Sequence, residues 1–106
     1  MSRVGIPSPP SIEFEGRRYE QIVNGERLGL GQRTGLLDVT DVATGRRLAA
    51  VSIYDPPRDP EMEADAGDVF FVAAELDAAR RRILIENERH ERFAFRIDDR
   101  SVQALE

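Results

Sequence analysis

Several residue types are missing from this chain of 106 residues. It has no cysteine, which excludes disulfide bonds, thiolate nucleophiles and cysteine-based zinc sites. Tryptophan is absent, and so is lysine, because all 15 basic residues are arginines. Arginine forms bidentate pairs with phosphates and carboxylates, but these arginines are scattered along the chain. We attribute their number to the codon bias of a GC-rich genome and assign no anion-binding site to them.

Long apolar runs are missing as well. No stretch approaches the roughly 20 residues that a membrane-spanning helix needs, and the N-terminal sequence MSRVGIPSPPS lacks the apolar core of a secretory signal. We therefore expect a cytoplasmic protein with no membrane contact. The formal net charge of −5 opposes binding to phosphate backbones, so we expect no nucleic-acid partner.

What remains is the composition of an ordinary folded domain, with 41% hydrophobic and 33% charged residues. The length suits one domain. Pro7, Pro9 and Pro10 predict a flexible, proline-rich lead-in over residues 1–11. Residues 12–106 then form a single β domain.

From Ile12 onward, short alternating apolar runs are separated by turn sequences, which is typical of an antiparallel meander. We predict an all-β fold in which an antiparallel meander of about six to eight short strands forms a small barrel or sandwich. Glu15-Gly16 predicts a first turn, and Asn24-Gly25 is a strong signal for a type I′ hairpin. The glycines of residues 29–35, GLGQRTG, indicate a strand break or bulge.

Residues 36–42 and 46–54 predict the clearest hairpin. A type I turn at Ala43-Thr44, followed by Gly45 in the left-handed region, gives a three-residue loop with a bulge. This register pairs Val39 with Ala49 and Leu37 with Val51, all on one face. Asp41 is placed to accept a backbone N–H in the turn.

A second hairpin is predicted from the alternation in residues 83–85 and 93–97. A three-residue loop at positions 88–90 pairs Ile85 with Phe93 and Ile83 with Phe95 on one face, whereas a two-residue loop separates the two sets. His90 is then expected at positive φ. A last short strand is expected near residue 102.

Residues 68–82 allow two interpretations. The adjacent Phe70 and Phe71 between two valines favour a strand. A helix capped by Asp68 and ending at the arginines of positions 80–82 is the alternative. Periodicity alone does not decide between them.

Two segments resemble the blade hairpins of quinoprotein-type β-propellers: LLDVTDVATGRRLAAV at residues 36–51 and RILIENERHERFAFRIDD at residues 82–99. In that family a strand ends in Asp, a Thr-Gly turn follows, and the next strand begins with an apolar residue, usually tryptophan. Here Ala49 and Ala50 follow Leu48, and the chain is too short for a ring of blades. The resemblance implies local hairpin geometry and no cofactor. The layout is also similar to that of small, uncharacterised bacterial all-β proteins, which implies no activity.

The connection between residues 55 and 68 is acidic. It carries Asp55, Asp59, Glu61, Glu63, Asp65 and Asp68. Oxygen ligands at alternate positions suit calcium, but the spacing departs from the EF-hand pattern. We interpret the segment as a solvated loop and keep a divalent-metal site there as an alternative.

Other candidate residues also have simple structural interpretations. His90 is the only histidine, and we place it in an exposed turn without an orienting partner. Residues 29–35 match neither standard phosphate-binding loop. Ser52 and Ser101 lack the context of a nucleophile, and the arginines at 80–82 belong to a turn. We assign no catalytic, cofactor-binding or metal-binding residue and no cofactor.

These exclusions favour a non-enzymatic protein-binding or accessory module. Its partner is another protein, or a second copy, that pairs with an open strand edge. The alternatives are a small-ligand carrier with its ligand in the mouth of a β-barrel and the metal site in the acidic loop.

Overall fold

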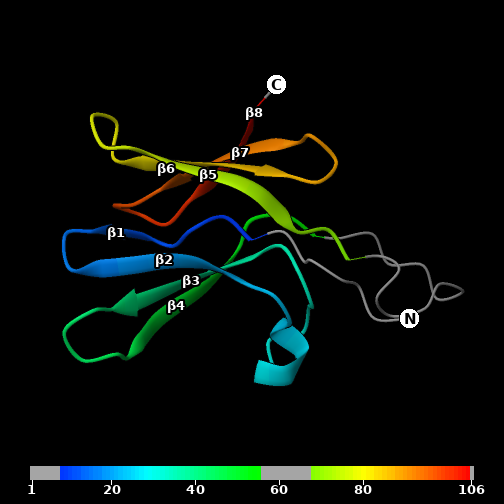
Figure 1. Cartoon of the computed structure of the whole chain (residues 1–106), viewed down its shortest axis with the longest axis horizontal. Coiled ribbons are helices and arrows are strands. Elements are labelled where there is room, and N and C mark those ends of the chain that lie inside the picture. The colour runs from blue at the N-terminus through cyan, green and yellow to red at the C-terminus, as the bar shows by residue number, and fades with distance from the viewer. Residues whose placement is uncertain (1–7, 56–67, 106) are drawn as a thin grey trace, which may run out of the picture.

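The computed structural model describes residues 8–55 and 68–105 and shows two antiparallel sheets stacked as a sandwich (Figure 1). The first sheet contains β1 (Ile12–Phe14), β2 (Arg17–Ile22), β3 (Leu36–Asp41) and β4 (Arg47–Ser52). The second contains β5 (Phe71–Asp77), β6 (Arg82–Asn87), β7 (Arg92–Arg96) and β8 (Val102–Leu105). Among the described residues, each strand pairs only with its neighbours in sequence. The predicted all-β meander is confirmed, as a sandwich and not as a closed barrel.

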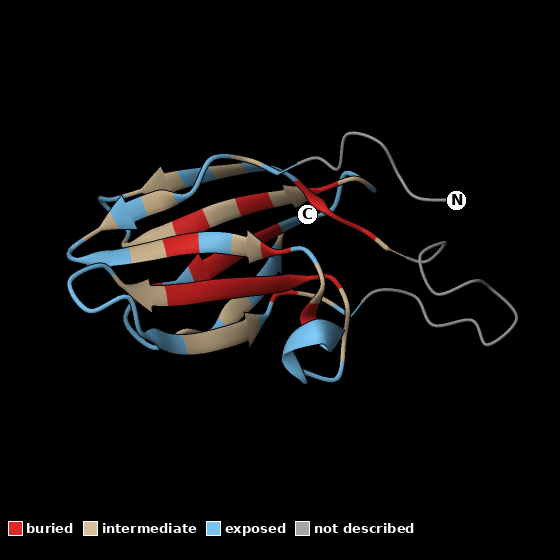
Figure 2. Ribbon diagram, turned by 60° about the horizontal axis from the view of Figure 1, so that its bottom comes forward, coloured by how far each residue is buried: buried red, intermediate tan, exposed pale blue. Residues whose placement is uncertain are grey.

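The core lies between the two sheets. The first sheet and its flanking residues contribute Tyr19, Leu37, Val39 and Ile53, and the second contributes Phe71, Ile83, Ile85, Phe93, Phe95 and Ile97. The Tyr19 and Phe95 rings meet across the interface with their centroids 5.9 Å apart. Figure 2 shows the buried residues concentrated along the middle strands. Burial of each large side chain contributes about 1.5–3 kcal/mol, so this shared core holds the sheets together.

The predicted register of the β3–β4 hairpin is confirmed, since Val39 faces Ala49 and Leu37 faces Val51. Gly45 has the expected positive φ of 74°. The predicted loop length is wrong by one residue, because the Asp41 N–H donates to the Arg46 carbonyl at 2.8 Å and closes a four-residue turn.

The additional turn residue is compensated within β4. Thr40 pairs with Arg47 while Val39 pairs with Ala49, so Leu48 forms a bulge. The wider turn is stabilised by Asp41, whose carboxylate accepts hydrogen bonds from the Ala43 N–H and the Thr44 hydroxyl at 3.2 and 2.9 Å.

The β6–β7 hairpin forms as predicted. Ile85 faces Phe93 and Ile83 faces Phe95. The Asn87 N–H donates to the Glu91 carbonyl at 3.0 Å and closes a three-residue loop. His90 lies in this loop at φ 65°.

Asn24-Gly25 does not form the predicted hairpin. Asn24 is extended, at φ −151°, and precedes a short 3-10 helix, η1 (Gly25–Leu28). Gly25 is buried against the Gln32 carbonyl and the Leu36 side chain, which leaves no room for a Cβ. The type I′ geometry occurs instead between β1 and β2, where Glu15 and Gly16 have φ values of 51° and 79°.

The strand interpretation of residues 69–76 is confirmed and the helix alternative is wrong. Phe71 pairs with Asn87 and Asp77 pairs with Arg82, so β5 is an edge strand of the second sheet. The expected last strand forms as β8 and pairs with β7. Within the described residues, no helix has the length and hydrophobicity of a membrane-spanning segment.

Candidate functional site

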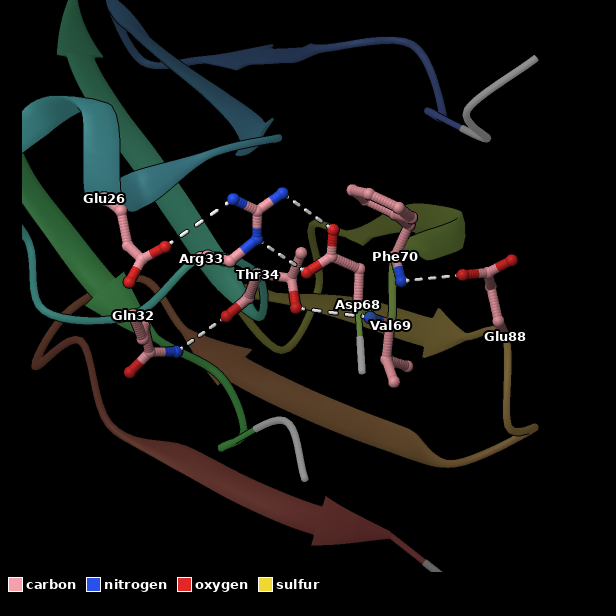
Figure 3. Close-up of polar contacts among 8 residues, drawn as sticks. All are labelled: Glu26, Gln32, Arg33, Thr34, Asp68, Val69, Phe70 and Glu88. Atoms are coloured by element: carbon pink, nitrogen blue, oxygen red, sulfur yellow. Dashed lines mark hydrogen bonds and ion pairs between the residues drawn. The ribbon is translucent and has the colours of Figure 1, made fainter. Parts of the chain in front are cut away.

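Arg33 is the centre of a polar network at the end of the sandwich that carries η1 (Figure 3). Its Nε and Nη2 each donate to one carboxylate oxygen of Asp68 at 3.0 Å. Its Nη1 lies 3.5 Å from Oε1 of Glu26. Hydrogen bonding to Asp68 is the main cause that raises the pKa of the Arg33 guanidinium. Because Arg33 already binds two carboxylates, residues 29–35 are not arranged as a phosphate cradle.

The backbone that enters β5 is held by side chains from other elements (Figure 3). The Val69 N–H donates to Oγ1 of the fully buried Thr34 at 3.2 Å. The Phe70 N–H donates to Glu88 at 3.0 Å, and the Phe71 N–H donates to Oε1 of Gln21 at 2.6 Å. Buried backbone donors need such partners, so this network fixes the second sheet relative to the first.

The end of β4 is tied to the same network. Gln32 Nε2 donates to the carbonyls of Thr34 and Tyr54 at 2.8 and 3.1 Å, and the Ser52 hydroxyl donates to Gln32 Oε1 at 3.2 Å. The Tyr54 hydroxyl donates to the Val69 carbonyl at 2.5 Å, and its ring stacks on Phe93.

Burial is the main cause that raises the pKa of the Tyr54 hydroxyl, followed by the negative charges of Glu88 and Glu91. The hydroxyl therefore stays protonated and acts as a hydrogen-bond donor. The network presents no nucleophile beside a base, and its geometry is that of a structural clamp.

The opposite end of the sandwich carries a second clamp. Arg81 donates to Glu15 at 2.7 and 2.9 Å and to Asp98 at 2.9 Å, which joins turns of both sheets. Its guanidinium also lies 5.6 Å from the centroid of the Phe14 ring. Arg80 and Arg82 both pair with Asp77. The three arginines at positions 80–82 therefore stabilise turns, in agreement with their predicted role.

The other predicted candidates are not brought together. The His90 side chain is 89% exposed, and its Nδ1 lies 3.8 Å from Oε2 of Glu86. The Ser101 hydroxyl donates to Asp99 at 2.7 Å and caps a turn. Asp55 is exposed. The candidate metal ligands Asp59, Glu61, Glu63 and Asp65 lie outside the described residues. Within residues 8–55 and 68–105, no three acidic or histidine side chains are grouped as metal ligands.

A shallow hollow of about 250 Å³ lies against the second sheet. Its lining is Ala73, Ala74, Glu75, Leu84, Ile85, Glu86, Arg92 and Leu105. Leu84 and Glu86 alternate along β6 with the core residues Ile83 and Ile85. The hollow therefore belongs to the outer surface of the sheet, and not to a barrel mouth of the kind that the ligand-carrier alternative requires.

The outer edge of β4 is an open strand edge in the part of the chain that the structure describes. Among the described residues, only β3 pairs with β4. The Ile53 N–H donates to the Gly35 carbonyl at 2.7 Å, which sets the alternation of the ladder. By this alternation Ala49 and Val51 bond to β3, while the backbone groups of Ala50 and Ser52 point away from the sheet.

The composition of this edge also favours pairing. Residues 48–54, LAAVSIY, contain no charged residue, proline or glycine. Uncharged, regular edge strands are ready templates for another strand, which natural proteins usually prevent. The sequence already contained this signal, but only the strand order shows that β4 is an edge.

Comparison of the chain with protein-family models, with curated proteins and with solved structures gives no match. The resemblance of the two hairpins to quinoprotein-type blades therefore rests on their turn sequences alone. The candidate site is defined by the physical properties of the β4 edge.

Proposed function

We propose that this protein is a non-enzymatic protein-binding module that binds its partner by main-chain pairing along the outer edge of β4. The supporting observation is the outward direction of the backbone groups of Ala50 and Ser52 on an uncharged edge strand. An extended segment placed there extends the first sheet by one strand and gains a ladder of hydrogen bonds. The flanking side chains then select the partner.

The edge is ordered before a partner binds. One side of β4 is paired with β3, and Gln32 fixes the Ser52 hydroxyl and the Tyr54 carbonyl beyond its end. A preorganised strand loses little conformational freedom on binding, which strengthens the interaction. The neighbouring Gln32 therefore contributes to the proposed function indirectly, by holding Ser52 and Tyr54 at the end of β4.

The other edges are less suitable. β1 has only three residues. β5 carries two acidic residues, Glu75 and Asp77, along its length. β8 is a four-residue strand. β4 combines six residues with an uncharged stretch, so it favours pairing more than the other three edges do.

Ala50→Pro tests the proposal, with Ala104→Pro as the matched control. The Arg96 N–H donates to the Ser101 carbonyl, so by alternation Ala104 directs its N–H away from β7, as Ala50 does from β3. Proline at either site removes one outward donor and no ladder hydrogen bond. We expect tagged wild-type and Ala104→Pro chains to retain a protein partner from the native cell and Ala50→Pro to lose it.

Circular dichroism and thermal melting check that both proline variants remain folded. A partner that binds equally to folded Ala50→Pro contradicts pairing at β4. Partner loss in Ala104→Pro alone moves the binding edge to β8.

A further inference from the structure

We infer that the strand that pairs with β4 is the β4 of a second copy, in antiparallel register centred on Ala50. This inference rests on the proposed function of the β4 edge. Two copies related by a twofold axis then join their first sheets into one continuous sheet. The length of the edge, its side chains and its flanking charges favour this pairing.

The length of the regular edge sets the centre. The part of β4 that is available for regular pairing starts at the bulge residue Leu48 and ends with the strand at Ser52. A twofold antiparallel pair uses this whole stretch only when Ala50 faces Ala50 of the partner subunit, with Leu48 facing Ser52 of the partner subunit. Ala50 directs its N–H and C=O outward, so the central pair is of the hydrogen-bonded type.

The side chains along the edge permit this approach. Ala49 and Ala50 are small, and Val51 turns toward the core. Leu48 is 41% exposed in the single chain. In the pair it lies across from Ser52 of the partner subunit, where neighbouring strands cover part of its apolar surface.

Charges at the two ends of the edge are complementary. Arg46 and Arg47 precede the uncharged stretch, and Asp55 follows it. Arg47 donates to Asp38 at 2.7 Å, whereas the Arg46 side chain has no ion pair among the described residues. Antiparallel pairing places the arginine end of each β4 edge beside the Asp55 end of the other. Parallel pairing instead brings the arginine ends together, which is unfavourable.

The absence of cysteine makes the register directly testable. Facing residues of a hydrogen-bonded antiparallel pair have Cα atoms about 5.5 Å apart, which lies within the span of a disulfide bond. Ala50→Cys should therefore form a disulfide-linked dimer under mild oxidation, and Ala104→Cys should not. A mixture of Leu48→Cys and Ser52→Cys chains should cross-link more than either variant alone.

Analytical ultracentrifugation tests association without modification. The mass of the wild-type chain should rise with concentration from 11.9 kDa toward twice that value, because one strand pair is a small interface and the equilibrium depends on concentration. Ala50→Pro should remain monomeric. Asp55→Arg should weaken the dimer, and Arg46→Asp in the same chain should restore it.

Two results overturn the inference: a wild-type chain that is monomeric at every concentration, or cross-linking of Ala104→Cys as efficient as that of Ala50→Cys. A monomeric chain that still captures another protein, and loses it on Ala50→Pro, keeps the proposed function and refutes self-pairing. If Ala50→Pro does not fold, the cysteine variants decide the question, since they keep every backbone hydrogen bond.

Discussion

Arg33 and Asp68 are separated by 35 residues in sequence and meet through two parallel hydrogen bonds of 3.0 Å. The pair connects the loop before β3 to the backbone that enters β5. It therefore joins the two sheets at the point where the chain passes from one to the other. Bidentate pairs of this kind fix both distance and orientation.

Arg33→Gln should lower the free energy of unfolding by about 1–3 kcal/mol, because the largely buried Asp68 side chain then loses its two hydrogen bonds from the guanidinium. The Asp68 side chain is only 8% exposed. Urea denaturation measures the change. Arg18→Gln is the control, since the Arg18–Glu13 pair is exposed on both sides and contributes about 0–1 kcal/mol. Equal effects of the two variants contradict the role of Arg33 as a clamp.

Stability should fall in acid, partly through the Arg81 clamp. The hydrogen bond from Arg81 holds the pKa of Glu15 below its ordinary value of 4.5. A lowered pKa means that the stabilisation is complete above the ordinary value and is lost as the pH falls through the value of the folded state. The melting temperature should therefore decrease below about pH 4.5. In Arg81→Gln this decrease should be smaller, and parallel curves for the two proteins would exclude the effect.

Alkaline conditions should destabilise the fold through Tyr54. Burial and the nearby carboxylates raise the pKa of its hydroxyl above the ordinary value of 10.0. The unfolded chain ionises first, so stability is complete below the ordinary pKa and is lost as the pH rises above it. Tyr54→Phe should cost about 0.5–1.5 kcal/mol at neutral pH, since the Val69 carbonyl loses its donor. Melting curves of this variant should also show a weaker alkaline decrease, and an unchanged decrease would assign it to other groups.

His90→Gly should be neutral or stabilising by up to about 1 kcal/mol, because glycine relieves the left-handed strain at φ 65° while it adds freedom to the unfolded chain. Phe93→Ala should cost about 3–5 kcal/mol, as a buried aromatic residue does. Chemical denaturation compares both variants with the wild type. A loss above about 1 kcal/mol in His90→Gly, together with loss of partner capture, would instead identify His90 as a functional residue held under strain.

Local patterns predicted the strand pairing of the β3–β4 and β6–β7 hairpins well, but they misplaced the turn at Asn24-Gly25. The faces of Ile83, Ile85, Phe93 and Phe95 follow from alternation, because a one-residue shift exposes a whole apolar set. Asn24-Gly25 misled the prediction because the same dipeptide also suits the start of a helix. Contact between Gly25 and Leu36, which no local pattern contains, decides between the two structures.

The candidate site could be predicted only in part. The uncharged run of residues 48–54 is visible in the sequence, but a strand in a hairpin can have a second neighbour. The strand order of the folded chain is what leaves β4 open. Similarly, nothing near Arg33 in sequence points to Asp68, since their contact depends on how the two sheets stack.

The division of the strands into two consecutive sheets has a consequence for folding. Every strand ladder among the described residues joins neighbours in sequence, so each sheet forms by closing short loops, and docking of the two sheets is the main long-range step. Chains with mostly local contacts refold quickly. A cut within residues 56–67 leaves each sheet whole on its own fragment, so the two halves, mixed in solution, should reassemble through the apolar surface they share.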